Sequence, residues 1–154
     1  MHPNEEVLTR FYTCFQQKDP AGMAACYHPD AVFSDPIFQT LKRERAVAMW
    51  HMLIGRSKDM EIIFSAIQAD EQQGTAHWDA YYTYSATGRK VHNIVDAHFR
   101  FQDGLILLHQ DTFDLAKWAS QALGTSGRLF GWTPFMQQAM RRNAAKALDT
   151  YIKA

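Results

Sequence analysis

Three aspartates and one histidine stand in sequence surroundings that suit proton-transfer chemistry. Asp35 ends an apolar run, Asp96 lies inside another, and Asp111 follows His109 by two positions. A carboxyl group in apolar surroundings has a raised pKa, and a neighbouring imidazole can determine which of the two groups carries a charge. Such groups can take up and release protons near neutral pH, so these four residues are our candidates for catalytic acids and bases.

Each of the three aspartates also has a purely structural interpretation. Asp35 directly precedes a proline and could cap a turn at the end of a strand. Asp96 could be a buried structural carboxyl group that is satisfied by hydrogen bonds. Asp111 could pair with Arg100 or Lys90 on the surface of the sheet. The sequence leaves these alternatives open.

The elements that must position these residues change from helices to strands along the chain. Apolar residues that recur every three or four positions predict helices over residues 4–18, 20–27, 43–55, 114–123 and 134–154. Stretches of β-branched and aromatic residues with a period of two predict strands over residues 31–35, 60–67, 75–85, 91–101 and 105–113. The turn Gln102-Asp103-Gly104 is a hairpin signal, so we expect the last four strands to form an antiparallel meander.

Side chains alternate across a strand, so a cavity that contains the three aspartates also contains their neighbours two positions away. With residues from the helices, this predicts an apolar, aromatic cavity for a small hydrophobic ligand. The expected ligand-binding residues are Phe11, Tyr27, Phe33, Trp50, Trp78, Tyr82, His98 and Phe113. His92, His98 and His109 lie on neighbouring predicted strands, but strand-borne imidazoles more often form hydrogen bonds than bind metals, so we expect no metal site.

Composition and charge narrow the classes of partner. The 154 residues include 16 Lys and Arg and 16 Asp and Glu, without a basic run, so we expect no nucleic-acid partner. No apolar run approaches the roughly 18 residues of a membrane-spanning helix, so no membrane partner is expected and a cytoplasmic location is the default. We expect one domain over residues 1–154 that uses no cofactor.

Two segments carry a resemblance to a known family. In Tyr27–Pro36 a strand ends in Asp-Pro, and Phe101–Ile106 has the hairpin pattern Phe-x-x-Gly-x-Ile. With the order of helices and strands, they resemble SnoaL-like and ketosteroid-isomerase-like members of the nuclear transport factor two-like superfamily. The resemblance implies an α+β fold in which a cone-shaped, curved antiparallel β-sheet wraps around the N-terminal helices, as in a cystatin-like α+β barrel. The core would span residues 4–118, and a C-terminal helical extension residues 119–154.

Comparison with ketosteroid isomerase implies roles for two of the aspartates. Asp35 lies at the position of the general base, and Asp96 at that of the neutral carboxylic acid that stabilises the enolate oxygen. Phe11 lies where the isomerase has its oxyanion tyrosine, and Tyr27 and Trp50 lie where it has two supporting tyrosines. The resemblance thus implies both carboxyl groups but only half of the oxyanion hole.

Limonene epoxide hydrolase belongs to the same superfamily and offers a second partial match. The segment His109–Leu115 resembles its last strand, with Asp111 at the position of the water-activating aspartate. The arginine and the second aspartate of that enzyme correspond to Trp78 and Ala80. Epoxide hydrolysis therefore ranks below a general acid–base reaction.

Two classes of function follow. In the first, the chain is a cofactor-independent acid–base enzyme of the ketosteroid isomerase or polyketide cyclase type. Asp35 would be the base, Asp96 the neutral donor, and Asp111 with His109 an auxiliary pair. In the second, the same cavity binds a ligand or a partner protein without catalysis. Catalysis by this pair requires Asp35 and Asp96 to converge within about 5–8 Å over one cavity. The resemblance and the exposed sheet face also predict a homodimer.

Overall fold

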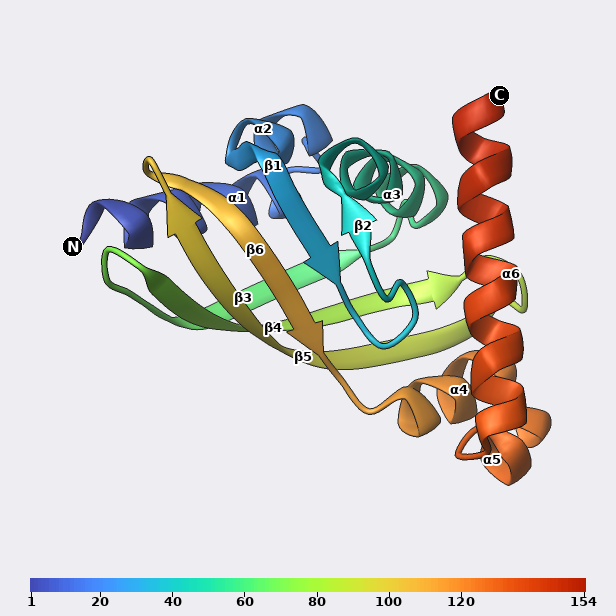
Figure 1. The fold of residues 1–154 in the computed structure, drawn as a ribbon. Coiled ribbons are helices and arrows are strands. Elements are labelled where there is room, and N and C mark those ends of the chain that lie inside the picture. Colours follow the sequence, from blue (N-terminus) through green and yellow to red (C-terminus); the bar gives the residue numbers. More distant parts are fainter.

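A computed structural model describes residues 1–154, and Figure 1 shows helices packed over one face of a curved sheet of six strands. In chain order the elements are α1 (Pro3–Gln16), α2 (Pro20–Ala25), β1 (Tyr27–Ser34), β2 (Leu41–Lys42), α3 (Arg43–Arg56), β3 (Glu61–Ala69), β4 (Gln73–Tyr84), β5 (Arg89–Gln102), β6 (Leu105–Thr112), α4 (Leu115–Leu123), α5 (Thr125–Phe130) and α6 (Pro134–Lys153). The expected α+β fold with a curved sheet is confirmed, and the sheet stays open because its edge strands, β2 and β3, do not pair.

The strands lie in the order β2-β1-β6-β5-β4-β3. The predicted meander is present, because β3, β4, β5 and β6 pair with one another in sequence, each antiparallel to the next. The pair β1 and β6 is parallel, so the expectation of an antiparallel sheet fails at this one place. A parallel pair needs a long crossover, and here one helix and four strands separate its two members in sequence.

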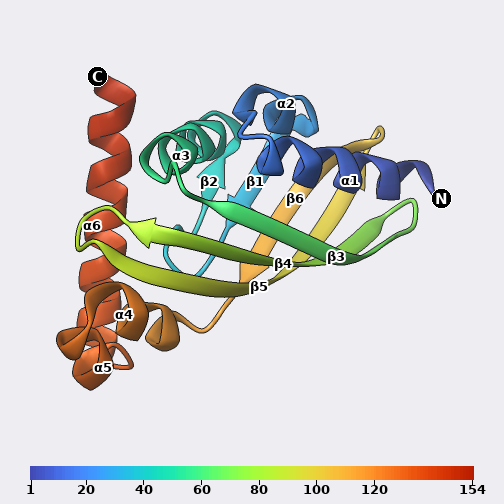
Figure 2. The same ribbon diagram turned by 180° about the vertical axis from the view of Figure 1, so that it is seen from behind.

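Two local features shape the hairpins of the sheet. Asp103 and Gly104 both take left-handed backbone angles, with φ of 55° and 73°, as a two-residue hairpin loop requires. In β3 the register with β4 shifts between Ser65 and Gln68, where Ala66 has a φ of 55°. A bulge of this kind bends and twists its strand, and it contributes to the curvature that Figure 2 shows from behind.

The concave face of the sheet is covered by α1 and α3. The apolar stripe of α1 packs against β3 and β4, and α3 packs against β1. In β5 buried side chains alternate with exposed ones from Val95 to Gln102. The largest side chains that are fully buried between these elements include Leu8, Phe11, Tyr12, Phe33, Met49 and Phe99. This core forms the floor on which the candidate site is built.

Three helices follow β6, and the expected extension over residues 119–154 begins within the first of them, α4. Figure 1 shows α6 standing across one end of the sheet beside α3. Leu148 is fully buried, Asp149 forms an ion pair of 2.9 Å with Arg45, and Arg141 donates a hydrogen bond to the carbonyl oxygen of Pro36. The short helix α5 lies between the predicted helices 114–123 and 134–154, in a stretch that contains Gly124, Gly127 and Gly131. No helix combines the length and the apolar character that crossing a bilayer would require.

Candidate functional site

An apolar cavity of about 310 Å³ opens between the concave side of the sheet, α3 and α6. Hydrophobic residues make up 18 of the 25 that line it, so its shape and chemistry suit a small, mainly apolar ligand with a few polar groups. Two predicted catalytic residues and four predicted ligand-binding residues lie on its wall, namely Asp35, Asp111, Trp50, Trp78, Tyr82 and Phe113.

Asp35 follows β1 at the turn that leads away from the sheet. Its Oδ1 accepts hydrogen bonds from the backbone N–H groups of Ile37 at 2.7 Å and Phe38 at 2.6 Å, so one oxygen caps the turn. The other oxygen has no hydrogen-bond donor in the protein. Burial raises the pKa of Asp35 to about 7; the N–H of Phe38 opposes this rise, and the negative charge of Asp111 adds to it. Asp35 can therefore hold a proton at the cavity wall near neutral pH.

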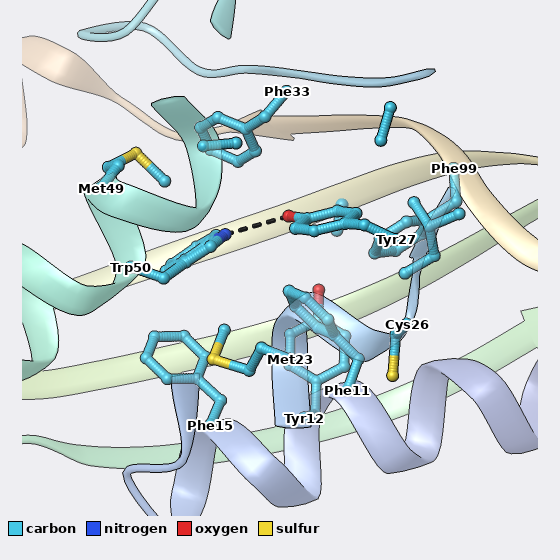
Figure 3. Close-up of a cluster of buried hydrophobic side chains, with 14 of the residues drawn as sticks. Phe11, Tyr12, Phe15, Met23, Cys26, Tyr27, Phe33, Met49, Trp50 and Phe99 are labelled. Carbon is cyan, nitrogen blue, oxygen red and sulfur yellow. Dashed lines mark hydrogen bonds between the residues drawn. The ribbon is translucent and has the colours of Figure 1, made fainter. Parts of the chain in front are cut away.

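Asp111 and His109 are buried side by side on β6, with exposed fractions of 4% and 0%. The His109 Nε2 atom lies 2.9 Å from Asp111 Oδ1, and Nδ1 lies 2.9 Å from the hydroxyl of Tyr27. The indole N–H of Trp50 in turn donates to that hydroxyl at 3.0 Å, as the dashed line in Figure 3 marks. Four side chains from β1, α3 and β6 thus form one continuous hydrogen-bonded chain.

The chemistry of these groups determines which atom donates and which accepts in each of these hydrogen bonds. An indole N–H only donates, so the oxygen of Tyr27 accepts from Trp50 and its own proton goes to Nδ1 of His109. His109 is then neutral, carries its proton on Nε2, and donates it to Asp111. This is the arrangement in which every proton of these hydrogen bonds finds an acceptor, with Asp111 Oδ1 as the last acceptor.

Phe11, Tyr27 and Phe33 are buried behind the cavity wall, so the expectation that they line the cavity is wrong. Figure 3 shows them in the aromatic cluster around Trp50. The rings of Phe11 and Phe33 pack edge-on against the imidazole of His109, with centroids 5.4 Å and 4.9 Å away. Their contribution is to hold the imidazole in place, because a ring packed on several sides has little freedom to rotate.

Asp96 and His98 lie on the outer face of the sheet, so the expectation that they line the cavity is also wrong. The inward side chains of β5 include Val95 and Ala97, and alternation turns the residues between and beyond them outward. The Asp96 side chain is 80% exposed and lies 2.8 Å from Nδ1 of His77. A difference of one position along a strand exchanges its two faces, so Asp35 and Asp96 diverge, whereas Asp35 and Asp111 share the cavity.

Several wall residues are absent from the predicted set. Asn93 faces inward on β5 opposite Ala80 of β4, and its even spacing from Val91 and Val95 is the signal that could have located it. Trp118 on α4 and a stripe of α6 also line the cavity. Periodicity identifies such stripes as apolar, but it does not say which surface they will cover. The α6 residues on the wall are Met140, Asn143, Ala144 and Ala147.

The remaining polar groups of the sheet form a separate cluster. His92 and His98 are on the outer face and His109 is inside, so the three imidazoles do not converge. On the outer face, His77 and His92 each lie 2.8 Å from Asp79. No group of three or more His, Cys, Asp or Glu side chains is arranged to hold a metal ion.

The comparison with families gives one match, the SnoaL-like domain, over residues 8–109, from α1 to β6. No curated protein matches the chain. Among solved structures, a hypothetical protein of Catenulispora acidiphila with a ketosteroid isomerase-like fold, in complex with trimethylamine, is 15% identical with a TM-score of 0.70; the match covers 87% of this chain and 100% of that one. The proposed polyketide cyclase IdmH of Streptomyces antibioticus is 21% identical with a TM-score of 0.67, covering 80% and 100%. An LEH-like epoxide hydrolase of M. tuberculosis is 20% identical with a TM-score of 0.64, covering 87% and 95%. At these identities the structures show a shared fold.

Proposed function

The chain belongs to the SnoaL-like domain family, and we propose that its cavity binds a small hydrophobic molecule and performs cofactor-independent acid–base chemistry on it. The reaction would be of the ketosteroid isomerase or polyketide cyclase type, in which a carbon-bound proton beside a carbonyl group is moved. The observation that carries this proposal is that Asp35 and Asp111 face one apolar cavity in different protonation environments.

The two carboxyl groups take different roles because their surroundings favour different protonation states. Asp111, which receives the N–H of His109, is the base that removes a proton from the carbon beside the carbonyl group. The electron pair of the broken C–H bond forms a carbon–carbon double bond, and negative charge develops on the carbonyl oxygen. Asp35, with a pKa of about 7, donates its proton to that oxygen or hydrogen-bonds to it. Return of a proton to a different carbon completes an isomerisation.

This assignment differs from the roles implied by ketosteroid isomerase. There the neutral donor is a carboxylic acid at the position of Asp96, which in this chain lies outside the cavity. In this chain Asp111 is the second carboxyl group that shares the cavity with Asp35. Asp35 is the neutral one of the two, because burial favours its protonated form. His109, Tyr27 and Trp50 orient Asp111.

A non-catalytic binding protein is the alternative, and one observation favours it. Phe11, at the position of the isomerase tyrosine, is buried and has no hydroxyl group, so that part of the oxyanion hole is missing. Epoxide hydrolysis is a weaker candidate, because the cavity wall carries Trp78 and Ala80 where the hydrolase has its arginine and second aspartate.

A carbon acid of suitable size tests the proposal. 2-Tetralone is a small bicyclic ketone, and the exchange of its α-protons in D₂O can be followed by proton NMR. Its binding can be followed separately by quenching of tryptophan fluorescence, because Trp50, Trp78 and Trp118 line the cavity. We expect binding together with exchange well above the buffer rate. Binding without exchange would favour the non-catalytic alternative, and the absence of both would contradict the proposal.

We also propose that the chain forms a homodimer. Ile63 and Ile94 on the outer face of the sheet are 58% and 40% exposed, and a second copy would remove this apolar surface from water. Size-exclusion chromatography with light scattering measures the mass directly. A monomer near 17.7 kDa at micromolar concentration would contradict the dimer.

A further inference from the structure

The hydroxyl group of Tyr82 lies on the cavity wall, where it accepts a hydrogen bond but donates none within the protein. Its oxygen accepts the indole N–H of Trp118 at 2.8 Å, and no protein group accepts its own proton. Burial raises the pKa of Tyr82 to about 12, so the phenol keeps that proton throughout the physiological range. The side chain of Tyr82 is partly buried at the cavity wall, and its hydroxyl proton is free to bind an acceptor atom of a ligand in the cavity.

We propose that Tyr82 is a catalytic residue that donates a hydrogen bond to the carbonyl oxygen of the substrate, and that Trp118 positions its hydroxyl group. The proposal rests on the proposed function, because an oxyanion donor is useful only where negative charge develops on oxygen. It also narrows the substrate class to ketones and related carbonyl compounds whose oxygen can accept a hydrogen bond from a neutral phenol.

The contact with Trp118 gives the hydroxyl group a direction. Once the indole N–H occupies one lone pair of the oxygen, the phenolic proton must point to another side. A donor bound to the oxygen also polarises the O–H bond and makes it a better donor. Trp118 itself is buried against Val91 and Leu115, and its ring meets that of Tyr84 edge-on at 5.2 Å, so its N–H is held firmly.

Tyr82 and Asp35 are two proton donors on the wall of one cavity. Both side chains line it, and the charge of Asp35 is one of the influences that raise the pKa of Tyr82. A carbonyl oxygen there would receive one hydrogen bond from the Tyr82 hydroxyl and one from the protonated carboxyl of Asp35. The pair would supply the two donors of an oxyanion hole and would replace the hydroxyl group that Phe11 lacks.

The position of Trp118 adds a consequence for the segment that follows the matched domain. The family match ends at residue 109, whereas Trp118 belongs to α4 beyond it. The segment after the matched domain would then contribute to the reaction centre itself, in addition to closing the cavity. Variation of this segment is expected to change how well the hydroxyl group of Tyr82 is oriented.

A binding comparison tests the donor without requiring catalysis. Tetralin has the same ring skeleton as 2-tetralone but no oxygen, so the ratio of their dissociation constants isolates the carbonyl contact. We expect Tyr82→Phe to weaken the binding of 2-tetralone by about 2- to 10-fold and to leave the binding of tetralin unchanged, because the variant loses one net hydrogen bond to the carbonyl oxygen. Tyr81→Phe is the matched control, because the neighbouring side chain points to the outer face. An equal effect on both ligands, or none on either, would overturn the proposal.

The exchange reaction tests the role in catalysis. Removal of one oxyanion donor is expected to lower kcat for 2-tetralone exchange by about 10²–10³-fold, a much larger change than the rise in KM that follows from the weaker binding. Trp118→Phe is expected to lower kcat less, and to have no further effect when Tyr82 is already Phe, because it acts through that hydroxyl group. Additive losses in the double variant would assign Trp118 a merely structural role. A wild-type protein that discriminates the two ligands but catalyses no exchange would sink the proposed function and leave the donor role of Tyr82 intact.

Discussion

Replacement of Asp35 by Asn should make the protein more stable at alkaline pH. The native carboxyl group keeps its proton up to a pKa of about 7, compared with a usual value of 3.8. Between these two values the native state binds more protons than the unfolded state, so its stability falls as pH rises. At about 1.4 kcal/mol per pKa unit, the loss due to Asp35 is roughly 2.5 kcal/mol between pH 5 and pH 8. Asn has no charge to bury, and its oxygen can still accept the N–H groups of Ile37 and Phe38.

Urea unfolding of the wild type and the Asp35→Asn variant at pH 5, 6, 7 and 8 measures this effect. The difference in unfolding free energy between the two proteins should move in favour of the variant by roughly 2.5 kcal/mol across that range. Titrating groups that do not interact with Asp35 contribute equally to both proteins and cancel in the difference. Two curves that run parallel from pH 5 to pH 8 would refute the claim that burial holds Asp35 in its protonated form.

Two substitutions and one NMR measurement test the residues that hold the site in place. Tyr27→Phe removes the hydroxyl group between Trp50 and His109 and should cost about 1–3 kcal/mol in urea unfolding, because it leaves a buried N–H without an acceptor; wild-type stability would contradict the hydrogen-bonded chain. In ¹⁵N NMR spectra, His109 should appear as the neutral tautomer with its proton on Nε2, and a proton on Nδ1 would reverse the direction that we assign. Leu148→Ala should cost about 2–5 kcal/mol, because this side chain is fully buried where α6 meets the core, and a loss well below that would mean that α6 is not anchored there.

The fold could be predicted from the sequence where the pattern is local and repeated. The period of two in the meander and the Asp103-Gly104 turn locate β3 to β6 within a few residues of their observed bounds. The two-residue strand β2 is too short to show a period, and α5 lies in a stretch whose glycines favour a loop. The parallel pairing of β1 with β6 depends on how distant segments meet in space, which no local pattern records.

The candidate site could be predicted less completely, for a geometric reason. Side-chain alternation follows from residue numbers, but the choice of inner face rests on one reference position. With Asp96 as that reference, the prediction exchanges the inner and outer faces of β5. Taking apolar Val95 and Val91 as the reference would have turned Asn93 inward. The contribution of α6 depends on how the helix docks, which its apolar stripe alone does not specify.

The most direct test of the central claim compares two aspartates on opposite faces of the sheet. Asp111→Asn and Asp96→Asn make the same chemical change, one at the cavity wall and one on the outer surface. The account predicts that the exchange of 2-tetralone α-protons falls by at least about 10²-fold in the Asp111 variant and stays at the wild-type rate in the Asp96 variant. Equal rates in both variants, or a loss confined to the Asp96 variant, would contradict the assignment of Asp111 as the base.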